Sequence, residues 1–408
     1  MKERNLFVLD IGSTKVACLA IAVTPEGEME IAGAGVAPQK GMQRGVVTDL
    51  ESTAMAISDA VRQAQQQAGF SGSGLLVSVG GPHVEGVNTQ GIVPIYPRSR
   101  PINRDDILQV INHSRQVMMP PDREMIQALP REFRVDGQRG VKKPIGMSGS
   151  KLEVFTYILT GQTTHLSNLD RAVQLAGYRI DQMVFGPLAT AAAVMSPEEQ
   201  ELGCVLVDLG GGTTDVGVYS GGTLVASACI PIGGQHVTND LSKLLKTSPE
   251  EAERLKVRFG AAMGAGVSED DSVDVLQIGQ SQPRPMARKV LCEIIESRMR
   301  EIALIVRQQI EKSGLNGLLP AGVVLTGGGA EMEKTPEVFE SVLKHMRARL
   351  GSTSVEGPHA ELLNRPGMAT VIGLAKVGAE SEEDVLAPAH GLEHWKEKFR
   401  SLKSIWSK

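Results

Sequence analysis

Hydrophobic and polar positions predict a chain in which strands and helices alternate. Three apolar runs between residues 6 and 37, LFVLDIG, KVACLAIAV and MEIAGAGVA, predict consecutive strands. A helix is expected from about Asp49 to Ala68, with Asp49 as its N-cap and Gly69 behind it, followed by the strand LLVSVGG. A comparable set of apolar strands begins after residue 201. The pattern predicts an α/β protein with two lobes.

Residues 84–160 have a different character. They are polar and carry seven of the 21 prolines, which predicts a separate small α/β subdomain inserted in the first lobe. Strands are expected at 84–95, 131–136 and 152–160, with a helix from the cap Asn103 through Met118.

The remaining segments complete the predicted division of the chain. Residues 379–390 are acidic and contain a proline, as a solvated linker does. The predicted parts are a first-lobe core of 1–83 and 161–200 to which 366–378 returns, the inserted subdomain 84–160, a second-lobe core of 201–240 and 313–365, a helical subdomain 241–312, the linker 379–390 and a terminal helix 391–408.

Composition narrows the class of protein. At 408 residues the chain is too long for one ordinary core, and its 41% apolar content is enough to fill two. The net charge of −5 gives no general reason to bind nucleic acid, and the four cysteines lack metal-ligand spacing. The start MKERN does not read as a signal peptide, and no stretch reaches the length of a membrane span. A cytosolic protein, anchored peripherally if at all, is expected.

The candidate chemistry lies in a repeated motif. VLDIGSTKV at residues 8–16 returns as VDLGGGTTDV at 207–216, each an apolar strand with an Asp before a turn of Gly and hydroxyl residues. Such turns offer backbone N–H groups to an anion, so two facing copies predict a clamp for a polyphosphate. Asp10 and Asp208 are expected to hold Mg²⁺ through its waters. A single such turn is usually a plain hairpin; the matched pair is what indicates a nucleotide.

A third Gly-rich element is VVLTGGGA at residues 323–330, a strand that runs into three glycines. It allows a flat adenine to lie against the backbone, although alone it reads equally as the entry to a helix. With the two Asp turns, this set resembles the actin, Hsp70 and sugar-kinase superfamily. FGPLATAA (185–192) and PGMATVIG (366–373) resemble the two helices that connect its lobes, and the pattern spans residues 6 to 377.

One branch of that superfamily fits better than the others. No room exists for an insertion near the third strand, where actin has one, and the extra mass comes at 84–160 instead. That placement, and the segment LPREFRVDGQRGVKKPIGMSG (129–149), resemble the bacterial cell-division family FtsA. The resemblance implies an actin-like two-lobe ATPase fold with a relocated insertion, and ATP with Mg²⁺ as ligands.

The resemblance also extends the expected nucleotide site. It implies that IGGQ (232–235) starts a helix at the nucleotide, and that an acid and a lysine, Glu253 and Lys256, contact the ribose and adenine; their spacing alone fits a surface ion pair equally well. Hydrolysis is expected to be slow, and no catalytic residue is assigned, with Asn168 and Asp170 as weak candidates. The predicted nucleotide-binding residues are Gly12, Ser13, Thr14, Lys15, Gly210, Gly211, Gly212, Thr213, Thr214, Gly233, Gly234, Glu253, Lys256, Gly327, Gly328, Gly329 and Met332.

The last 18 residues predict an amphipathic helix that lies in a membrane interface. Its apolar residues fall within an arc of roughly 140°, cations flank that arc, and both tryptophans of the chain are here. A helix docked on the protein's own core is the alternative, but an acidic linker precedes this one, and FtsA ends in the same way. The predicted membrane residues are Leu392, Trp395, Phe399, Leu402, Ile405 and Trp406.

A second partner surface is expected on the arginine-rich helix from about Met286 to Lys312. Between residues 284 and 312 the chain has seven cations and four acids. Most such faces are merely solvated. The resemblance implies that this subdomain receives the acidic C-terminal tail of the tubulin-like FtsZ, with Arg288, Arg298 and Arg300 as candidates.

The resemblance implies a protomer that polymerises with itself and ties the FtsZ ring to the anionic inner face of the cytoplasmic membrane at the division site. Other division proteins are expected as partners, and nucleic acid is not. The alternatives are a small-molecule kinase of the same superfamily and a pilus-assembly ATPase. The insertion site and the terminal helix disfavour the first, and the terminal helix disfavours the second.

Overall fold

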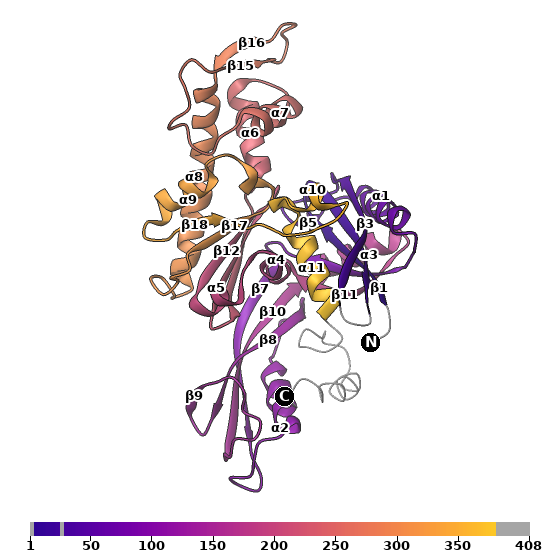
Figure 1. Cartoon of the computed structure of the whole chain (residues 1–408), viewed down its shortest axis with the longest axis vertical. Helices are drawn as coiled ribbons and strands as arrows, with labels where there is room; N and C mark the ends of the chain where they lie inside the picture. Colours follow the sequence, from indigo (N-terminus) through magenta and orange to yellow (C-terminus); the bar gives the residue numbers. More distant parts are fainter. Residues whose placement is uncertain (1–3, 25–27, 381–408) are drawn as a thin grey trace.

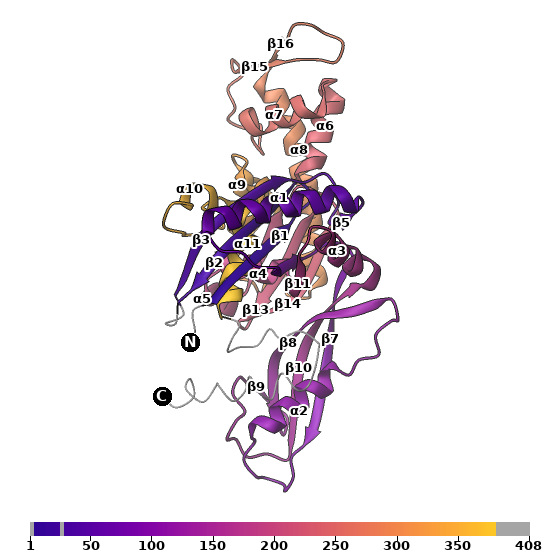
Figure 2. The same ribbon diagram turned by 90° about the vertical axis from the view of Figure 1, so that its right-hand side faces the viewer.

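The computed structural model describes residues 4–24 and 28–380 of the chain. The molecule is long: two sheets lie side by side at its centre, the segment 84–160 extends to one end, and helices from 234–312 extend to the other (Figures 1 and 2). The predicted terminal helix and all its membrane residues lie outside the described residues. Within the described ranges, no helix has both the length and the apolar character needed to cross a bilayer.

The first lobe is built on a five-stranded sheet covered on one face by α1, whose predicted caps are confirmed. Asp49 accepts a hydrogen bond from Ser52 N, and Gly69 adopts φ 73° behind the helix. The elements of this lobe are β1 (Arg4–Ile11), β2 (Lys15–Val23), β3 (Met29–Pro38), β4 (Met42–Gln43), β5 (Val46–Val47), α1 (Leu50–Ala68), β6 (Gly74–Val79), α3 (Thr163–Leu175) and β11 (Arg179–Phe185).

The inserted segment forms its own four-stranded sheet, in the order β7-β10-β8-β9, packed against one helix. Apolar side chains from its strands and helix, among them Val93, Val110 and Val154, make a small core separate from those of the lobes. Its elements are β7 (Val84–Pro94), α2 (Arg104–Arg115), β8 (Arg123–Val135), β9 (Gln138–Val141) and β10 (Lys151–Gln162).

Two predictions for this segment were wrong in extent. The helix capped by Asn103 ends at Arg115, three residues before Met118, where Gln116 N donates to His113 O in a tighter turn. Pro120 and Pro121 prevent the helix from resuming beyond that turn. Strand β8 begins eight residues before the predicted start and passes through Pro130, which pairs with Thr156 beside a register shift. Such an irregularity is where a sheet tolerates a proline.

The base of the insert is joined to both lobes. Val84, Tyr157 and Leu159 belong to the hydrophobic core of the first lobe. Across the molecule, Tyr157 Oη accepts a hydrogen bond from Ser227 N of the second lobe at 2.9 Å. Only the far end of the insert is therefore structurally separate from the lobes, because its near end packs in the central core.

The second lobe contains a second five-stranded sheet and the helical extension. Its elements are α5 (Pro197–Leu202), β12 (Cys204–Leu209), β13 (Thr214–Ser220), β14 (Thr223–Ile230), α6 (Gly234–Leu245), α7 (Pro249–Phe259), β15 (Ser272–Val275), β16 (Arg284–Ala287), α8 (Arg288–Lys312), β17 (Val323–Thr326), η1 (Gly328–Glu331), α9 (Thr335–Leu343), β18 (Ala348–Leu350) and α10 (Ala360–Leu363). The predicted start of the helical subdomain at 241 falls inside α6, and its helices are joined by the hairpin β15–β16.

The two central sheets share one topology. The strand order is β11-β6-β1-β2-β3 in the first and β18-β17-β12-β13-β14 in the second. In each, the Asp strand is antiparallel to the strand after the turn (β1 to β2, β12 to β13) and parallel to its other neighbour (β6, β17). The repeated sequence motif therefore marks two copies of one arrangement.

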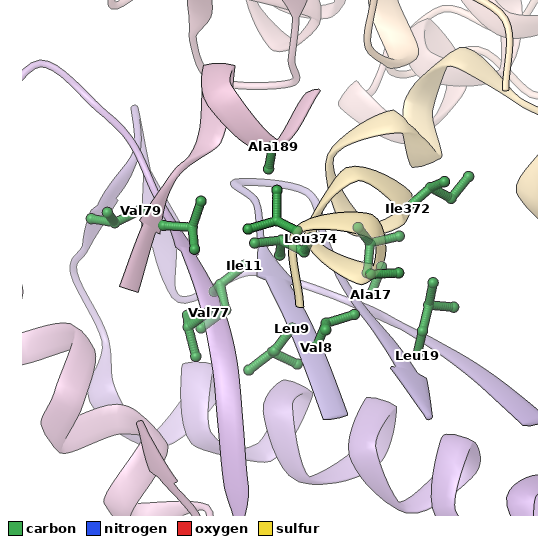
Figure 3. Packing of buried hydrophobic residues seen from close by; sticks show 14 of the residues in the cluster. Val8, Leu9, Ile11, Ala17, Leu19, Val77, Val79, Ala189, Ile372 and Leu374 are labelled. Carbon is green, nitrogen blue, oxygen red and sulfur yellow. The ribbon is translucent and has the colours of Figure 1, made fainter. Parts of the chain in front are cut away.

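Two connecting helices cross between the lobes, α4 (Gly186–Val194) and, after η2 (Pro366–Met368), α11 (Ala369–Glu380). Leu374 of α11 lies over apolar side chains of the first-lobe sheet, with Ala189 of α4 beside the same helix (Figure 3). Helix α11 continues two residues into the predicted linker, where Arg4 donates to the carbonyls of Gly378 and Ala379. These bonds satisfy two C-terminal carbonyls of the helix.

Candidate nucleotide-binding site

The two Asp turns form as the sequence predicts, each between an Asp strand and an antiparallel partner. Gly12 N donates to Lys15 O at 2.9 Å, which closes the first turn between β1 and β2. In the second, between β12 and β13, Gly210 N donates to Asp208 O at 3.1 Å. Each turn thus directs a short row of backbone groups away from its sheet.

The structure brings these turns together across the two lobes. A Cβ added to Gly211 would lie 2.4 Å from Thr14 Cγ2, and one added to Gly212 would lie 2.5 Å from Ser13 Oγ. At these distances a larger residue at either glycine would displace the Thr14 or Ser13 side chain, so the second turn packs directly on the hydroxyl residues of the first. Two turns almost 200 residues apart in sequence thereby form one backbone-lined region.

The hydroxyls of the turns are not all directed alike. Ser13 Oγ accepts a hydrogen bond from Gly45 N at 3.2 Å, and Thr14 is exposed. Thr214 is buried and donates to Ile232 O at 2.8 Å. Its side chain holds the turn against the segment before α6, so a phosphate contact from this residue would come through its backbone.

Lys15 lies between the turns and the second connecting segment. Its Nζ donates to Gly367 O and lies 3.2 Å from Met368 Sδ. Burial lowers the pKa of Lys15, against the attraction of Asp10, Glu331 and Asp208. The ammonium group is placed to exchange a neutral carbonyl for a phosphate oxygen, a stronger charge-assisted partner.

Asp10 and Asp208 face the same region from opposite lobes. Asp10 Oδ1 accepts from Ser78 Oγ at 2.6 Å. Asp208 Oδ2 accepts from Thr190 Oγ1 and Thr370 Oγ1, each at 3.2 Å. Burial, and then the charge of Asp10, raises the pKa of Asp208 to about 6.

Asp10 and Asp208 fit the predicted magnesium site, because a divalent cation prefers oxygen ligands. Its charge would offset both the burial of the two carboxylates and the repulsion between them. In that role Asp10 and Asp208 would hold the ion through its waters, and the ion would neutralise phosphate charge.

The predicted ribose contacts meet the start of α6. Lys256 Nζ is 2.7 Å from Glu253 Oε2 and donates to Thr238 Oγ1 at 2.9 Å and to Gly234 O at 3.2 Å. Gly234 N donates in turn to Gly210 O at 2.9 Å, and a Cβ on Gly233 would lie 2.5 Å from the same oxygen. Glu253 and Lys256 are therefore tied through α6 to the second Asp turn, which a plain surface ion pair would not be.

The TGGGA segment lies against the second turn from the other side. Gly327 has φ 83°, and a Cβ on it would lie 2.3 Å from Asp208 Oδ1. Gly329 packs beside Leu209, whereas a Cβ on Gly328 would meet open space. The half-buried Met332 packs on the core of the second lobe. A flat group could therefore approach the backbone at Gly328, as predicted for adenine.

The family model "Cell division protein FtsA" matches residues 205–373, and "SHS2 domain inserted in FTSA" matches residues 81–160. The cell division protein FtsA of Pseudomonas aeruginosa is 36% identical over 377 residues, covering 92% of this chain and 89% of that protein.

The chain belongs to the FtsA family.

The FtsA of Escherichia coli is 34% identical, covering 93% of this chain and 91% of that protein, and the FtsA of Bacillus subtilis is 33% identical, covering 92% and 83%. Such identity over most of both chains shows that this is a cell-division protein of the FtsA type. The insertion predicted at 84–160 coincides closely with the matched SHS2 domain.

Solved structures show that this FtsA family member has the actin-like fold. A PilM–PilN type IV pilus biogenesis complex aligns with a TM-score of 0.66 at 15% identity, covering 92% of this chain and 98% of that one. MreB5 of Spiroplasma citri bound to ADP aligns at 0.56 and 13% identity, covering 92% and 95%. A MamK double helical filament aligns at 0.53 and 11%, covering 92% and 99%. At sequence identities this low, the structural similarity shows the fold alone.

The sequence analysis did not identify several residues that line the site. Ser78 is the one hydroxyl in the apolar strand LLVSVGG, a weak signal that could have marked it. Thr190 and Thr370 lie in the two connecting helices that the sequence identified, but their shared contact with Asp208 depends on how those helices cross. Glu331 accepts from Gly367 N and pairs with Arg365, next to Lys15.

The candidate partner arginines all have carboxylates within the chain. Arg298 pairs with Asp240 through two nitrogens and with Glu301, and Arg288 pairs with Asp271 and Glu333. Arg300 pairs with Glu296 and has 41% of its side chain exposed, against 24% for Arg298 and 25% for Arg288. An incoming acidic tail would have to compete for these groups, and Arg300 is the most accessible.

Proposed function

We propose that this protein is an ATP-binding, actin-like protomer that polymerises and ties the FtsZ ring to the inner face of the cytoplasmic membrane. The observation that carries the proposal is the meeting of the two Asp turns, where Gly211 and Gly212 pack on Thr14 and Ser13. Lys15 and the carboxylates of Asp10 and Asp208 supply the charges that a Mg²⁺–polyphosphate requires.

Lys15→Ala is expected to weaken ATP binding and to leave the fold intact. The substitution removes one charge-assisted contact worth about 1.5–3 kcal/mol, so the dissociation constant should rise about 10- to 150-fold. Titration calorimetry with Mg–ATP measures it. Lys40→Ala is the matched control, because Lys40 is exposed on the same lobe. Equal affinity of Lys15→Ala and Lys40→Ala would remove Lys15 from the site.

Two parts of the chain are proposed to bind partners, one the FtsZ tail and the other the membrane. Helix α8 and its neighbours, with Arg288, Arg298 and Arg300, would receive the acidic FtsZ tail, and the amphipathic segment 391–408 would lie in anionic lipid. Actin-like filament relatives support self-assembly. The proposed location is the cytoplasmic face of the membrane at the division site, with no transmembrane span needed.

The far end of the insert is proposed as a protomer–protomer contact. It lies at one end of the long axis, where head-to-tail stacking would place it against the next protomer (Figures 1 and 2). Tyr96, which follows β7, is 67% exposed. Deleting 84–160 would also remove Val84 and Tyr157 from the central core, so a surface substitution is the cleaner test.

Tyr96→Glu is expected to raise the critical concentration for filaments on lipid at least about tenfold, because a charge in the contact must be desolvated. ATP affinity should not change. Met55→Glu is the control, since Met55 is a comparably exposed apolar residue on α1. Pelleting and electron microscopy on lipid monolayers measure both variants, and normal filaments from Tyr96→Glu would exclude this contact.

A further inference from the structure

One buried contact joins the insert to the lobe to which it does not belong. Tyr157, near the middle of β10, is 3% exposed, and its hydroxyl reaches β14 of the second lobe. Its Oη accepts a hydrogen bond from Ser227 N at 2.9 Å and lies 3.0 Å from Ser227 Oγ. A second contact, the ion pair of Lys142 with Glu201, has side chains that are 65% and 50% exposed and adds little stability. The buried contact is therefore the one able to transmit a movement of the second lobe to the insert.

The neighbouring strand leaves room for the tyrosine to reach that far. On β7, Gly86 lies two residues along from Asn88, the cross-strand partner of Tyr157. A Cβ on Gly86 would lie 1.9 Å from Tyr157 Oη and 2.0 Å from its Cζ, so the ring passes directly over this glycine. A larger residue there would displace the ring and its hydroxyl from Ser227. The contact therefore depends on a matched pair of residues on adjacent strands of the insert.

The hydrogen bond also satisfies a donor that the second-lobe sheet leaves open. Strand β14 is the outer strand of that sheet, and beyond β13 it has no strand partner among the described residues. The partly buried Ser227 N donates to Tyr157 Oη in place of a further strand. A backbone donor that loses its partner away from water costs free energy. The bond therefore favours keeping the insert and β14 together when either one moves.

The base of the insert also contacts the joint between the lobes. The buried Gln127 of β8 accepts a hydrogen bond at 2.8 Å from Phe185 N, the residue before the connecting helix α4. If Tyr157 stays bound to Ser227, rotation of the lobes about α4 and α11 changes the angle between the insert and the first lobe. Strand β10 has 12 residues and so spans about 40 Å. A small rotation at the base thus becomes a large displacement at the far end of the molecule (Figures 1 and 2).

We propose that the Tyr157–Ser227 contact makes the insert follow the second lobe, so that nucleotide binding between the lobes moves the protomer contact at the far end of the insert. The inference rests on the proposed function, and it makes Tyr157 a positioning residue that does not touch the nucleotide. Binding of Mg–ATP draws the two Asp turns together, and the second lobe carries β14 with it. Ser227 then moves Tyr157 and the insert. Nucleotide and filament contact thereby favour the same arrangement of the protomer.

Tyr157→Phe in the full chain keeps the ring and removes the hydroxyl. Spin labels at Gln66→Cys on α1 and Arg98→Cys at the far end of the insert, both exposed positions, report their distance by double electron–electron resonance. Labelling uses a Cys229→Ser chain, because the other three native cysteines are buried. With the tyrosine present, saturating Mg–ATP should change the mean distance by at least about 3 Å, as for a hinge movement. Tyr157→Phe should show less than half of that change.

The same substitution is measured for its effect on assembly. Mg–ATP should lower the critical concentration for filaments on lipid at least about fivefold in the wild type, but about twofold or less in Tyr157→Phe. The ATP dissociation constant by calorimetry should stay within about twofold of the wild type, because the hydroxyl is remote from the predicted nucleotide residues. A critical concentration raised equally with and without ATP would show a purely structural role and would overturn the inference.

Gly86→Ala and Lys142→Ala complete the test. Gly86→Ala displaces the tyrosine ring and should lose the ATP response as Tyr157→Phe does, whereas Lys142→Ala removes the exposed ion pair and should keep it. An equal response in the wild type and Tyr157→Phe would overturn the inference, as would a wild type that binds ATP with no change in distance. Loss of the response in Lys142→Ala would also overturn it, because the exposed pair would then carry the movement. Failure of the wild type to bind ATP would instead contradict the proposed function.

Discussion

Gly373→Ala is expected to destabilise the protein by about 3 kcal/mol, because among the glycines that the structure describes it is the one where an added methyl group would come closest to another atom. A Cβ on Gly373 would lie 1.6 Å from Ala189 O and 2.3 Å from its carbonyl carbon. Both are backbone atoms of α4, so no side-chain rotation relieves the clash. Helix α11 must move away from α4, and Leu374 then loses its packing on the first-lobe sheet (Figure 3).

The same helix provides the control for this prediction. Gly378 is also buried in α11, but a Cβ on it would lie 3.1 Å from Leu76 Cδ2, the end of a flexible side chain. Alanine is favoured over glycine within helices by about 1 kcal/mol, which should offset the cost of moving the Leu76 side chain. Gly378→Ala should therefore leave the free energy of unfolding nearly unchanged. Urea unfolding of both variants measures the difference. Equal stability of the two would mean that the helices do not approach as closely as described.

Trp395→Glu releases the protein from anionic liposomes. The substitution loses about 2 kcal/mol of apolar burial and adds about 1 kcal/mol of repulsion from the lipid headgroups, which together lower membrane affinity about 100-fold. ATP binding should be unchanged, because every residue predicted to contact the nucleotide lies between Gly12 and Met332 of the sequence. Co-sedimentation with vesicles containing phosphatidylglycerol measures the effect.

Ser404→Glu separates burial from charge. On the predicted helix Ser404 lies about 180° from Trp395. Ser404→Glu therefore adds the same negative charge as Trp395→Glu, but on the polar side of the helix. It should reduce binding only a few-fold. If Trp395→Glu and Ser404→Glu lose membrane affinity to the same large extent, net charge alone governs attachment. Equal binding of the wild type to neutral and anionic vesicles would argue against any role for the cations.

Sequence patterns predicted most of what positions the site. The Asp strands, both turns and the caps Asp49 and Gly69 follow from local rules that tertiary packing did not override. The end of α2 before two prolines also follows such a rule, which the prediction overlooked. Strand β8 was harder, because Pro130 is tolerated only through a register shift with its neighbour.

The remaining features depend on contacts between distant segments. Thr190 and Thr370 are ordinary helix residues until α4 and α11 cross and bring both hydroxyls to Asp208. In the sequence Asp215 is simply a second acid after the turn, and only the strand register shows that it holds the position that Ala17 holds in the first copy. Hydrophobic patterns define elements, whereas these polar contacts arise from how the elements meet.

The central claim is that nucleotide-dependent assembly holds this protein on the membrane. One terminal helix of the proposed kind would give weak attachment, and a filament that presents many such helices would gain avidity. Co-sedimentation of the full chain with anionic liposomes, measured with and without Mg–ATP across protein concentration, tests this most directly. Bound protein should rise steeply and only with ATP. Lys15→Ala should shift this rise to higher ATP concentration, and Trp395→Glu should abolish it. Equal binding with and without ATP at every concentration would contradict the central claim.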